Sequence, residues 1–285
     1  MGGGLGATSL GIFMKKFLLT FLFIYFSNNL YSLPDEFYPL RVLITESQYI
    51  VFGFARTFPE SENDDTHSIV EIKIINVLKG HIDSSKIRFK FDGGFFNMCP
   101  ASAYYQDSTY VLAFLNKDKD GNYFTYGLSD GSKTVSSENI SIYESFIKEM
   151  LLIVKIKNTE ERVNSICDWL VECAKYEITR YDGVAEIASD LNRQNFSFYP
   201  GNPGSFEITD VQKEKLRNIL STVDTVKFYD LDIVEILIGF DNTFLSEWVS
   251  EKLANNKFEK NYDNFIGNSL EEKLAKINQV NKTKK

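Results

Sequence analysis

Alternating apolar and polar residues run through the first half of the chain, and two segments show the pattern most clearly. In Ile69–Gly80, apolar residues alternate with Glu71 and Lys73, and the alternation slips by one residue near Ile75. In Lys86–Phe91, three apolar residues alternate with three basic ones. A period of two predicts half-buried strands rather than helices. The slip predicts a β-bulge that bends the longer strand.

Further strands are predicted around this pair, at Tyr49–Thr57, Thr109–Leu115, Tyr123–Leu128 and, after the Asp130-Gly131 turn, Lys133–Ser136. Thr109–Leu115 is apolar on both faces, which predicts a central strand. The short polar turns between strands predict a small five-stranded Greek-key β-barrel of the OB type, within residues 33–137.

From Ser137 onward the apolar residues recur every three or four positions, which predicts helices. They cover Ser137–Lys155, Thr159–Tyr176, Gly183–Leu191, Asp210–Leu220, Asp230–Phe240, Thr243–Leu253 and Ser269–Ile277, the last with a Ser269/Glu272 capping box. Short amphipathic helices in pairs favour a HEAT-like stack, and an irregular helical domain fits equally well because no fixed repeat period is visible. The predicted class is therefore α+β, with a helical domain at 138–277 and a flexible tail at 278–285.

The first 32 residues are typical of an export signal. Met14-Lys15-Lys16 is positively charged, Phe17–Phe26 is apolar but too short to span a bilayer comfortably, and Ser32 is a small residue at the expected cleavage position. Residues 1–13 precede this pattern and are left out of the fold prediction. We expect a mature protein that begins near Leu33, is exported to the periplasm or the extracellular space, and has no membrane span after signal cleavage.

Composition agrees with a folded protein of one or two domains and narrows the class of partner. The chain has 285 residues, of which 44% are hydrophobic and 14% aromatic, and a net charge of −8. A nucleic-acid binder needs a basic stripe to neutralise phosphates. The nearest feature is the alternation of Lys86, Arg88 and Lys90, which we interpret as a solvated sheet face. We therefore expect no nucleic-acid partner.

Short motifs within Leu43–Ser137 carry a family resemblance: Phe52-Gly53, Val77–Gly80, a lone Cys99 and Tyr110–Phe114. With these motifs the segment resembles the netrin-like, or tissue-inhibitor-of-metalloproteinase-like, OB-fold domain of exported bacterial proteins. Asp168–Ala174 and Thr179–Gly183 are similar to helix-repeat tails attached to such domains. The resemblance implies an exported binding protein with an OB barrel and a HEAT-like region.

Two departures from this family bear on function. In the family, a cysteine at the position of Cys99 tends to pair with one just after the next hairpin strand, where this chain has Gly127–Gly131. Cys99 is therefore expected to be unpaired, and no disulfide is expected. Inhibitors of the family chelate their target's zinc through an N-terminal cysteine, which the expected start at Leu33 lacks. Inhibition by that route is not expected, although inhibition through a loop stays open as an alternative.

No catalytic constellation is recognisable in the sequence. His67 and His81 belong to no metal-binding cluster, and the chain has no phosphate-binding glycine loop and no nucleophile elbow. We expect no metal, no cofactor and no catalytic residue. The enzyme alternative is a hydrolase that uses Asp182 or Glu186 near Arg180, if the fold brings paired carboxylates together.

Exposed aromatic residues often anchor protein interfaces, which makes four predicted loop residues candidates for binding: Phe95, Phe96, Tyr104 and Tyr105. They can equally pack under the barrel as core. Trp169 and Arg180 also have two interpretations, either a core aromatic and a salt-bridged arginine or parts of a groove on a helical array. The sequence favours a non-catalytic exported protein that binds another exported or envelope protein.

Overall fold

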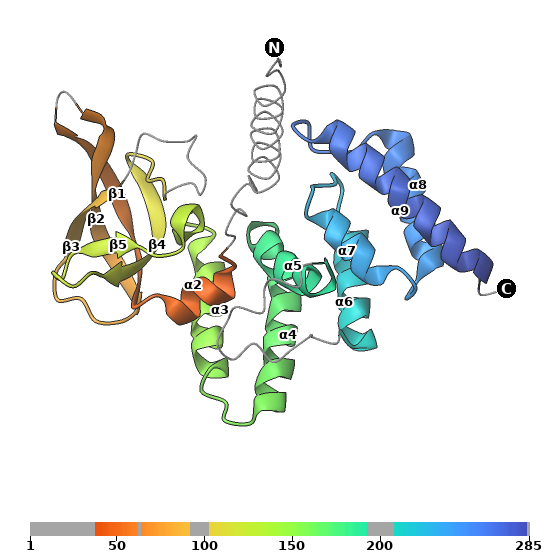
Figure 1. The fold of residues 1–285 in the computed structure, drawn as a ribbon, viewed down its shortest axis with the longest axis horizontal. Coiled ribbons are helices and arrows are strands. Elements are labelled where there is room, and N and C mark those ends of the chain that lie inside the picture. The colour runs from red at the N-terminus through yellow and green to blue at the C-terminus, as the bar shows by residue number, and fades with distance from the viewer. Residues whose placement is uncertain (1–37, 62–63, 92–102, 193–207, 284–285) are drawn as a thin grey trace, which may run out of the picture.

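The structure, a computed structural model, describes residues 38–61, 64–91, 103–192 and 208–283 of the chain. The predicted export signal, Phe95, Phe96 and Cys99 lie outside these ranges, so what we expect of them stays a prediction. Within the described ranges a β-sheet forms one end of the molecule, and helices extend from it towards the C-terminus (Figure 1). The predicted α+β class is confirmed.

The sheet contains six strands: β1 (Tyr49–Ser61), β2 (Asp64–Lys79), β3 (Lys86–Phe91), β4 (Thr109–Lys117), β5 (Tyr123–Thr125) and β6 (Ser132–Thr134). Their order is β3-β2-β1-β4-β5, with antiparallel neighbours, and β6 also pairs with β4. After three hairpin-linked strands, β4 returns to lie beside β1, which is the Greek-key order.

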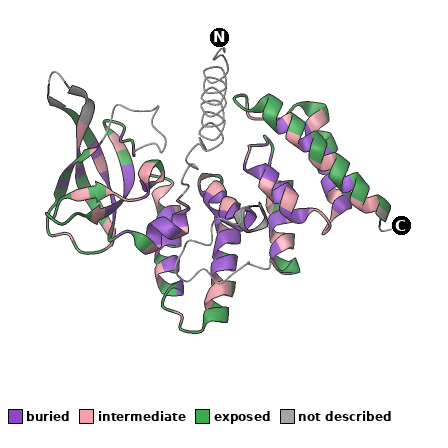
Figure 2. Cartoon of the chain, in the orientation of Figure 1, coloured by how far each residue is buried: buried purple, intermediate pink, exposed green. Residues whose placement is uncertain are grey.

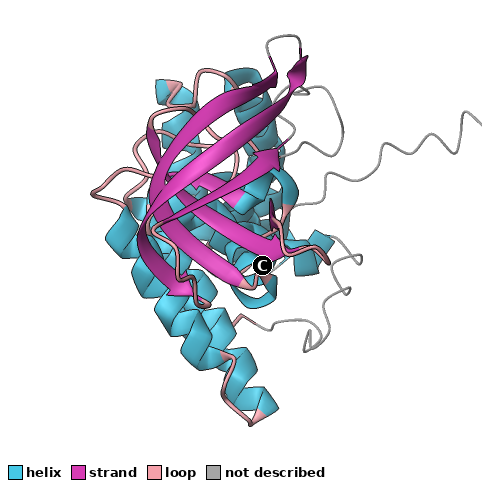
Figure 3. Ribbon diagram, turned by 90° about the vertical axis from the view of Figure 1, so that its left-hand side faces the viewer, coloured by secondary structure: helices cyan, strands magenta, loops and turns pink. Residues whose placement is uncertain are grey.

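The predicted closed barrel of five strands is wrong. The sheet has six strands and is open, since no ladder joins β3 to β5 in the described residues. Strand β5 ends at Thr125 rather than at Leu128, because Gly127 adopts a left-handed φ of 84° and begins a 3-10 turn, η1 (Leu128–Gly131). Figure 3 shows the twisted sheet that results.

The phase slip near Ile75 is a bulge, as predicted. Phe52 pairs with Asn76 and Gly53 pairs with Ile74, so Ile75 faces no residue of β1 and is 54% exposed. The extra residue changes the face on which the following side chains lie. Asn76 consequently points towards the helices, where its amide donates to a glutamate of the first long helix at 2.8 Å.

Each face of the sheet carries its own layer of apolar side chains. On the inner face, Val51, Ala55, Val70, Ile72, Ile87, Phe89, Val111, Ala113 and Leu115 form a core with Ala103 and Tyr105. On the opposite face, which we call the helix-side face, Ile50, Phe52, Leu112 and Phe114 join the core of the helices. Strand β4 is therefore buried on both faces, as its apolar sequence predicted.

Eight α-helices lie in the described residues: α2 (Leu40–Glu46), α3 (Ile140–Ile153), α4 (Thr159–Lys175), α5 (Glu177–Asn192), α6 (Asp210–Ser221), α7 (Asp230–Leu237), α8 (Asn242–Asn255) and α9 (Asp263–Thr283). The sequence did not predict α2, which packs against α3 and α5 (Figure 1). Helix α5 begins before the predicted start at Gly183. Helix α9 begins before Ser269, so the predicted cap lies inside it, and it continues to Thr283 through most of the predicted tail.

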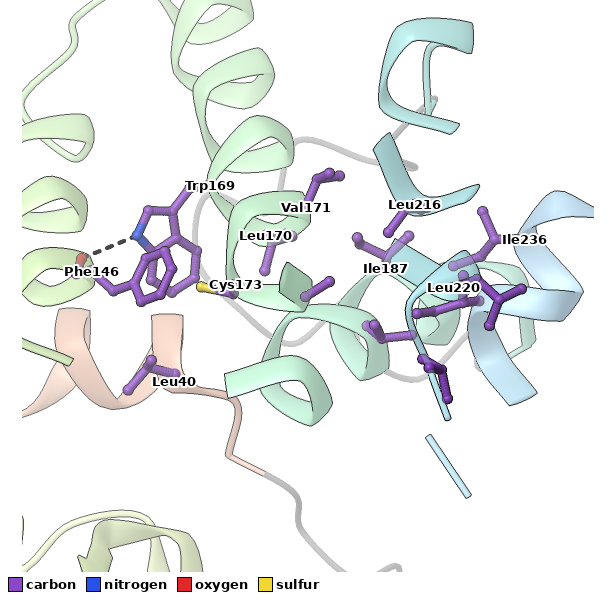
Figure 4. Close-up of a cluster of buried hydrophobic side chains, with 14 of the residues drawn as sticks. Leu40, Phe146, Trp169, Leu170, Val171, Cys173, Ile187, Leu216, Leu220 and Ile236 are labelled. Atoms are coloured by element: carbon purple, nitrogen blue, oxygen red, sulfur yellow. Dashed lines mark hydrogen bonds between the residues drawn. The ribbon is translucent and has the colours of Figure 1, made fainter. Parts of the chain in front are cut away.

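The helical core is continuous with the helix-side face of the sheet. Figure 2 shows the buried positions concentrated on α2, α4, α5 and α7. In α4, Trp169 is 1% exposed and its indole N–H donates to the carbonyl of Phe146 at 3.1 Å (Figure 4). Gly183 lets α5 approach α4 closely, because a Cβ there would lie 2.4 Å from the Leu170 carbonyl oxygen. This packing fixes where the charged side chains of α5 point.

Candidate functional site

Helix α5 carries the three charged residues that the hydrolase alternative requires, and each of them pairs with a different element. The three pairs are Arg180 with Asp230 of α7 at 3.2 Å, Asp182 with Lys133 of β6 at 3.2 Å, and Glu186 with Arg41 of α2. All six side chains are less than about one fifth exposed, with Lys133 the highest at 18%. We call these contacts the α5 ion pairs.

The turn between α4 and α5 sets the direction of these side chains. Thr179 Oγ1 donates to the carbonyl of Cys173 at 2.8 Å, and Arg180 Nε donates to the carbonyl of Ala174 at 2.9 Å. The last carbonyls of a helix have no partner within the helix. The two side chains therefore satisfy the end of α4 and direct the Arg180 guanidinium towards α7.

Carboxylates act as an acid and base pair when both face a substrate. In this structure Asp182 is 3% exposed and Glu186 is 6% exposed, and each faces a cation from another element. A buried charge that loses its partner costs about 3–5 kcal/mol. The α5 ion pairs therefore connect α5 to β6, α2 and α7, and removal of one member would leave the other charged and buried.

Titratable groups of four elements meet around Lys133. Burial lowers the pKa of the Lys133 ammonium, but Asp182, Tyr143 and Asp130 together outweigh burial, and the pKa lies above its usual value. Burial raises the pKa of the Cys173 thiol well above its usual value, and nearby carboxylates, first that of Asp182, raise it further. The Cys173 thiol stays protonated and is a poor nucleophile.

Tyr143 of α3 gives this cluster a measurable pH dependence. Its hydroxyl donates to the Ile178 carbonyl at 3.0 Å, and burial raises its pKa to about 12. An unfolded tyrosine titrates near pH 10, so between about pH 10 and pH 12 only the unfolded chain loses this proton. We expect the free energy of unfolding to fall by about 2–3 kcal/mol through Tyr143 over this range.

Urea denaturation at pH 8 to 12 measures this decline. Tyr143→Phe should have a shallower decline than the parent protein, whereas Tyr104→Phe, at a residue that is 50% exposed, should keep the parent slope. Equal slopes for the parent and Tyr143→Phe would contradict the assignment to Tyr143.

The two adjacent candidate tyrosines lie in different environments. Tyr104 is 50% exposed, whereas Tyr105 is 2% exposed and its hydroxyl hydrogen-bonds to Thr125 Oγ1 at 2.7 Å. The ring of Tyr105 contacts Phe89 and Phe91 edge-on in the inner core. Since Trp169 and Arg180 are buried as well, Tyr104 is the one candidate within the described ranges whose side chain lies at the surface.

The helix-side face of the sheet continues towards the β1–β2 turn as an exposed surface. Directly paired residues lie on the same face, and three rows cross β1, β2 and β3: Phe54, Lys73 and Lys86; Arg56, Glu71 and Arg88; Phe58, Ile69 and Lys90. Tyr110 of β4 pairs with Phe54 and extends the first row. We call these ten residues the basic-aromatic face.

Most of the basic-aromatic face is in contact with solvent. Its five cationic side chains are exposed, as are Phe58 at 38% and Tyr110 at 40%. The guanidinium of Arg88 lies 5.7 Å from the centre of the Phe58 ring. Glu71 is the acidic residue of the three rows, and its carboxylate pairs with Lys86 at 3.1 Å. The face thus combines aromatic residues and two arginines, which are types enriched at binding interfaces, with three lysines, which are depleted there.

The sequence identified one edge of this face and missed the rest. Lys86, Arg88 and Lys90 were recognised as a solvated row, but Arg56 and the aromatic residues of β1 lie about thirty positions earlier. The alternation of Phe54, Arg56 and Phe58 was the available signal. It places the three side chains on one face of a strand, and only the register of the β1–β2 and β2–β3 pairs adds the others.

The described part of the chain contains no cluster of metal-ligating side chains and no membrane-spanning helix. No three His, Cys, Asp or Glu side chains there gather closely enough to hold a metal ion. His81 lies on the surface beside Asp83, and His67 lies in β2. None of the helices among residues 38–283, in the stretches that the structure describes, combines the length and apolar composition needed to cross a bilayer.

The described residues therefore present two groups of charged side chains with different properties. The α5 ion pairs are buried and engage one another, whereas the basic-aromatic face is exposed. The α5 ion pairs give no support to a catalytic role, whereas the basic-aromatic face is compatible with binding. No protein-family model, curated protein or solved structure matches the chain.

Proposed function

We propose that the protein is a non-catalytic exported binding protein, with an OB-type, netrin-like N-terminal region and a helical C-terminal region. Its partner would be another exported or envelope protein. The observation that carries this proposal is the location of the charges. The carboxylates of Asp182 and Glu186 are occupied in buried ion pairs, whereas aromatic and cationic side chains gather on an open sheet face.

Binding of a protein through an open surface needs no cleft. Interfaces owe most of their energy to a few well-packed anchors, which are frequently aromatic residues or arginine. Tyr110 and Phe58 offer such anchors on one face. Arg56 and Arg88 lie in the row between them. The Greek-key order of the strands supports the OB resemblance, because the OB fold is a five-stranded, partly open barrel with Greek-key connections.

The export part of the proposal rests on residues 1–32, which carry the features of a signal peptide. Expression of the full chain in a bacterial host tests it, with N-terminal sequencing of protein from the periplasm and the medium. A start near Leu33 is expected. Protein that stays in the cytoplasm with residues 1–32 attached would contradict export.

The proposed binding to another protein is tested by cross-linking the mature protein in envelope extracts and identifying the proteins that are captured with it. We expect the same partner in independent preparations, with its mass unchanged, and no turnover of peptide or glycan substrates. Turnover that Glu186→Gln abolishes and Glu177→Gln on the same helix preserves would instead support the hydrolase alternative. A panel of proteinases assayed with the protein tests inhibition through a loop.

A further inference from the structure

We infer that the basic-aromatic face binds an extended acidic segment of the partner protein, an inference that rests on the function proposed above. Three features of the face support this choice of ligand. They are its positive charge, the spacing of its cations, which matches the side-chain spacing of an extended peptide, and the exposed aromatic rings beside the cations.

The first step is the local sign of the charge. Arg56, Lys73, Lys86, Arg88 and Lys90 are exposed on this face, while the chain as a whole has a net charge of −8. The carboxylate of Glu71 is engaged by Lys86 at 3.1 Å. Exposed charges act on one another within a Debye length of about 8–10 Å. Hydrogen bonds, first that from the Thr57 amide, lower the pKa of the exposed Asp107 carboxylate, and Arg56 lies close enough to lower this pKa further. The five cations still outnumber these two carboxylates, so a ligand on the face meets more positive than negative charge, and carboxylates complement it.

The second step is the spacing of the cations. Lys86, Arg88 and Lys90 alternate along β3, and side chains on one face of a strand repeat about every 6.6–6.8 Å. An extended peptide presents its own alternate side chains at the same interval. Acidic residues at every second position would meet successive cations in register. The guanidinium of Arg88 can also bind a carboxylate through two parallel hydrogen bonds.

The third step is the apolar surface beside the cations. The Tyr110 ring stacks on Phe52 with centroids 5.8 Å apart and meets Phe54 edge-on at 5.4 Å. These contacts hold Tyr110 in place although it is 40% exposed. Phe58 offers a second ring beneath the Arg88 guanidinium. Side chains that are already ordered lose little entropy on binding, so uncharged residues between the acidic ones find a prepared surface.

An acidic peptide fits this face better than a nucleic acid does. A polyanion extends beyond the face and meets the remainder of a chain with a net charge of −8, which opposes binding. A short acidic segment can cover the face alone, without reaching the remainder of the chain.

The probe for the test is a fluorescently labelled peptide of four Glu-Val repeats, titrated with the mature protein and followed by anisotropy. A peptide with four Glu followed by four Val has the same composition and a different spacing. We expect the alternating peptide to bind more tightly than the block peptide, and its affinity to fall as salt rises. Oligo-dT and phosphatidylglycerol vesicles are tested in parallel.

The matched variants are two pairs of charge reversals. Arg88→Glu with Lys90→Glu should weaken binding of the alternating peptide by about tenfold, because two attractive contacts become repulsive. Lys155→Glu with Lys157→Glu makes the same change in charge at the same spacing, at exposed residues after α3, and should change the affinity less than about twofold. Circular dichroism checks that both variants fold, and Arg88→Gln with Lys90→Gln replaces the first pair if it does not.

Four results would overturn the inference: equal binding of the block peptide, tighter binding of oligo-dT or vesicles, equal losses in both charge-reversal pairs, or no peptide binding below about 1 mM. The failure of the inference differs from the failure of the proposed function. A captured partner that the Arg88→Glu/Lys90→Glu variant retains as well as the parent removes the inference alone, whereas turnover of a substrate or capture of no partner removes the proposed function.

Discussion

Replacing Arg180 with alanine is expected to lower the free energy of unfolding by about 3–5 kcal/mol. The change leaves the Asp230 carboxylate, which has no exposed surface, without its cation. It also leaves the Ala174 carbonyl without the Arg180 donor at the end of α4. Burial already raises the pKa of Asp230 above its usual value, so its charged form depends on Arg180 and the Lys227 amide. Urea denaturation near pH 7 measures the loss.

Two further variants separate this explanation from a general effect of removing an arginine. Arg217→Ala removes two ion pairs, with Asp241 and Glu214, whose arginine is 31% exposed, and each pair should contribute no more than about 1 kcal/mol. Arg180→Leu combined with Asp230→Asn leaves no buried charge and keeps an acceptor for the Lys227 amide, so it should recover much of the stability. If Arg180 instead served a partner, Arg180→Ala would reduce binding and leave stability unchanged.

The strands that the sequence predicted best are those whose pattern is local. Lys86–Phe91 alternates without interruption, and β3 has the predicted bounds. The slip near Ile75 is also visible in a few residues, because a bulge changes the phase of a single strand. Closure of the sheet is different, since it depends on whether β5 reaches β3. The left-handed conformation of Gly127, just after the strand ends, is not visible in the alternation of apolar and polar residues.

The candidate sites were harder to predict because their members are far apart in the chain. Arg180 and Asp230 are separated by 50 positions, and Lys133 and Asp182 by 49. The sequence placed Asp182 and Glu186 near Arg180, which is correct along the helix, but it could not say that each side chain faces a different element. The basic-aromatic face likewise needs the pairing of three strands before Arg56 and Arg88 fall in one row.

Trp169→Ala is the second change for which we expect a large effect, a loss of about 3–5 kcal/mol in the free energy of unfolding. Trp169 is 1% exposed, and its ring meets Phe146 edge-on at 5.7 Å. The smaller side chain leaves a cavity in the core that joins α3 to α4, and packed surroundings relax only partly into such a space. Thermal and urea unfolding measure the loss, while affinity for a partner, measured below the melting transition, should stay unchanged.

A pair of Trp→Phe changes isolates the hydrogen bond from the volume. Trp169→Phe removes the donor to the Phe146 carbonyl at 3.1 Å and leaves that oxygen buried without it. Trp248 is 5% exposed, and its indole nitrogen has no hydrogen-bond partner among the described residues, so Trp248→Phe removes a donor that was unsatisfied. Both variants lose a similar volume. Trp169→Phe should therefore cost about 0.5–1.5 kcal/mol more than Trp248→Phe, and equal costs would contradict a net contribution of the Trp169 hydrogen bond.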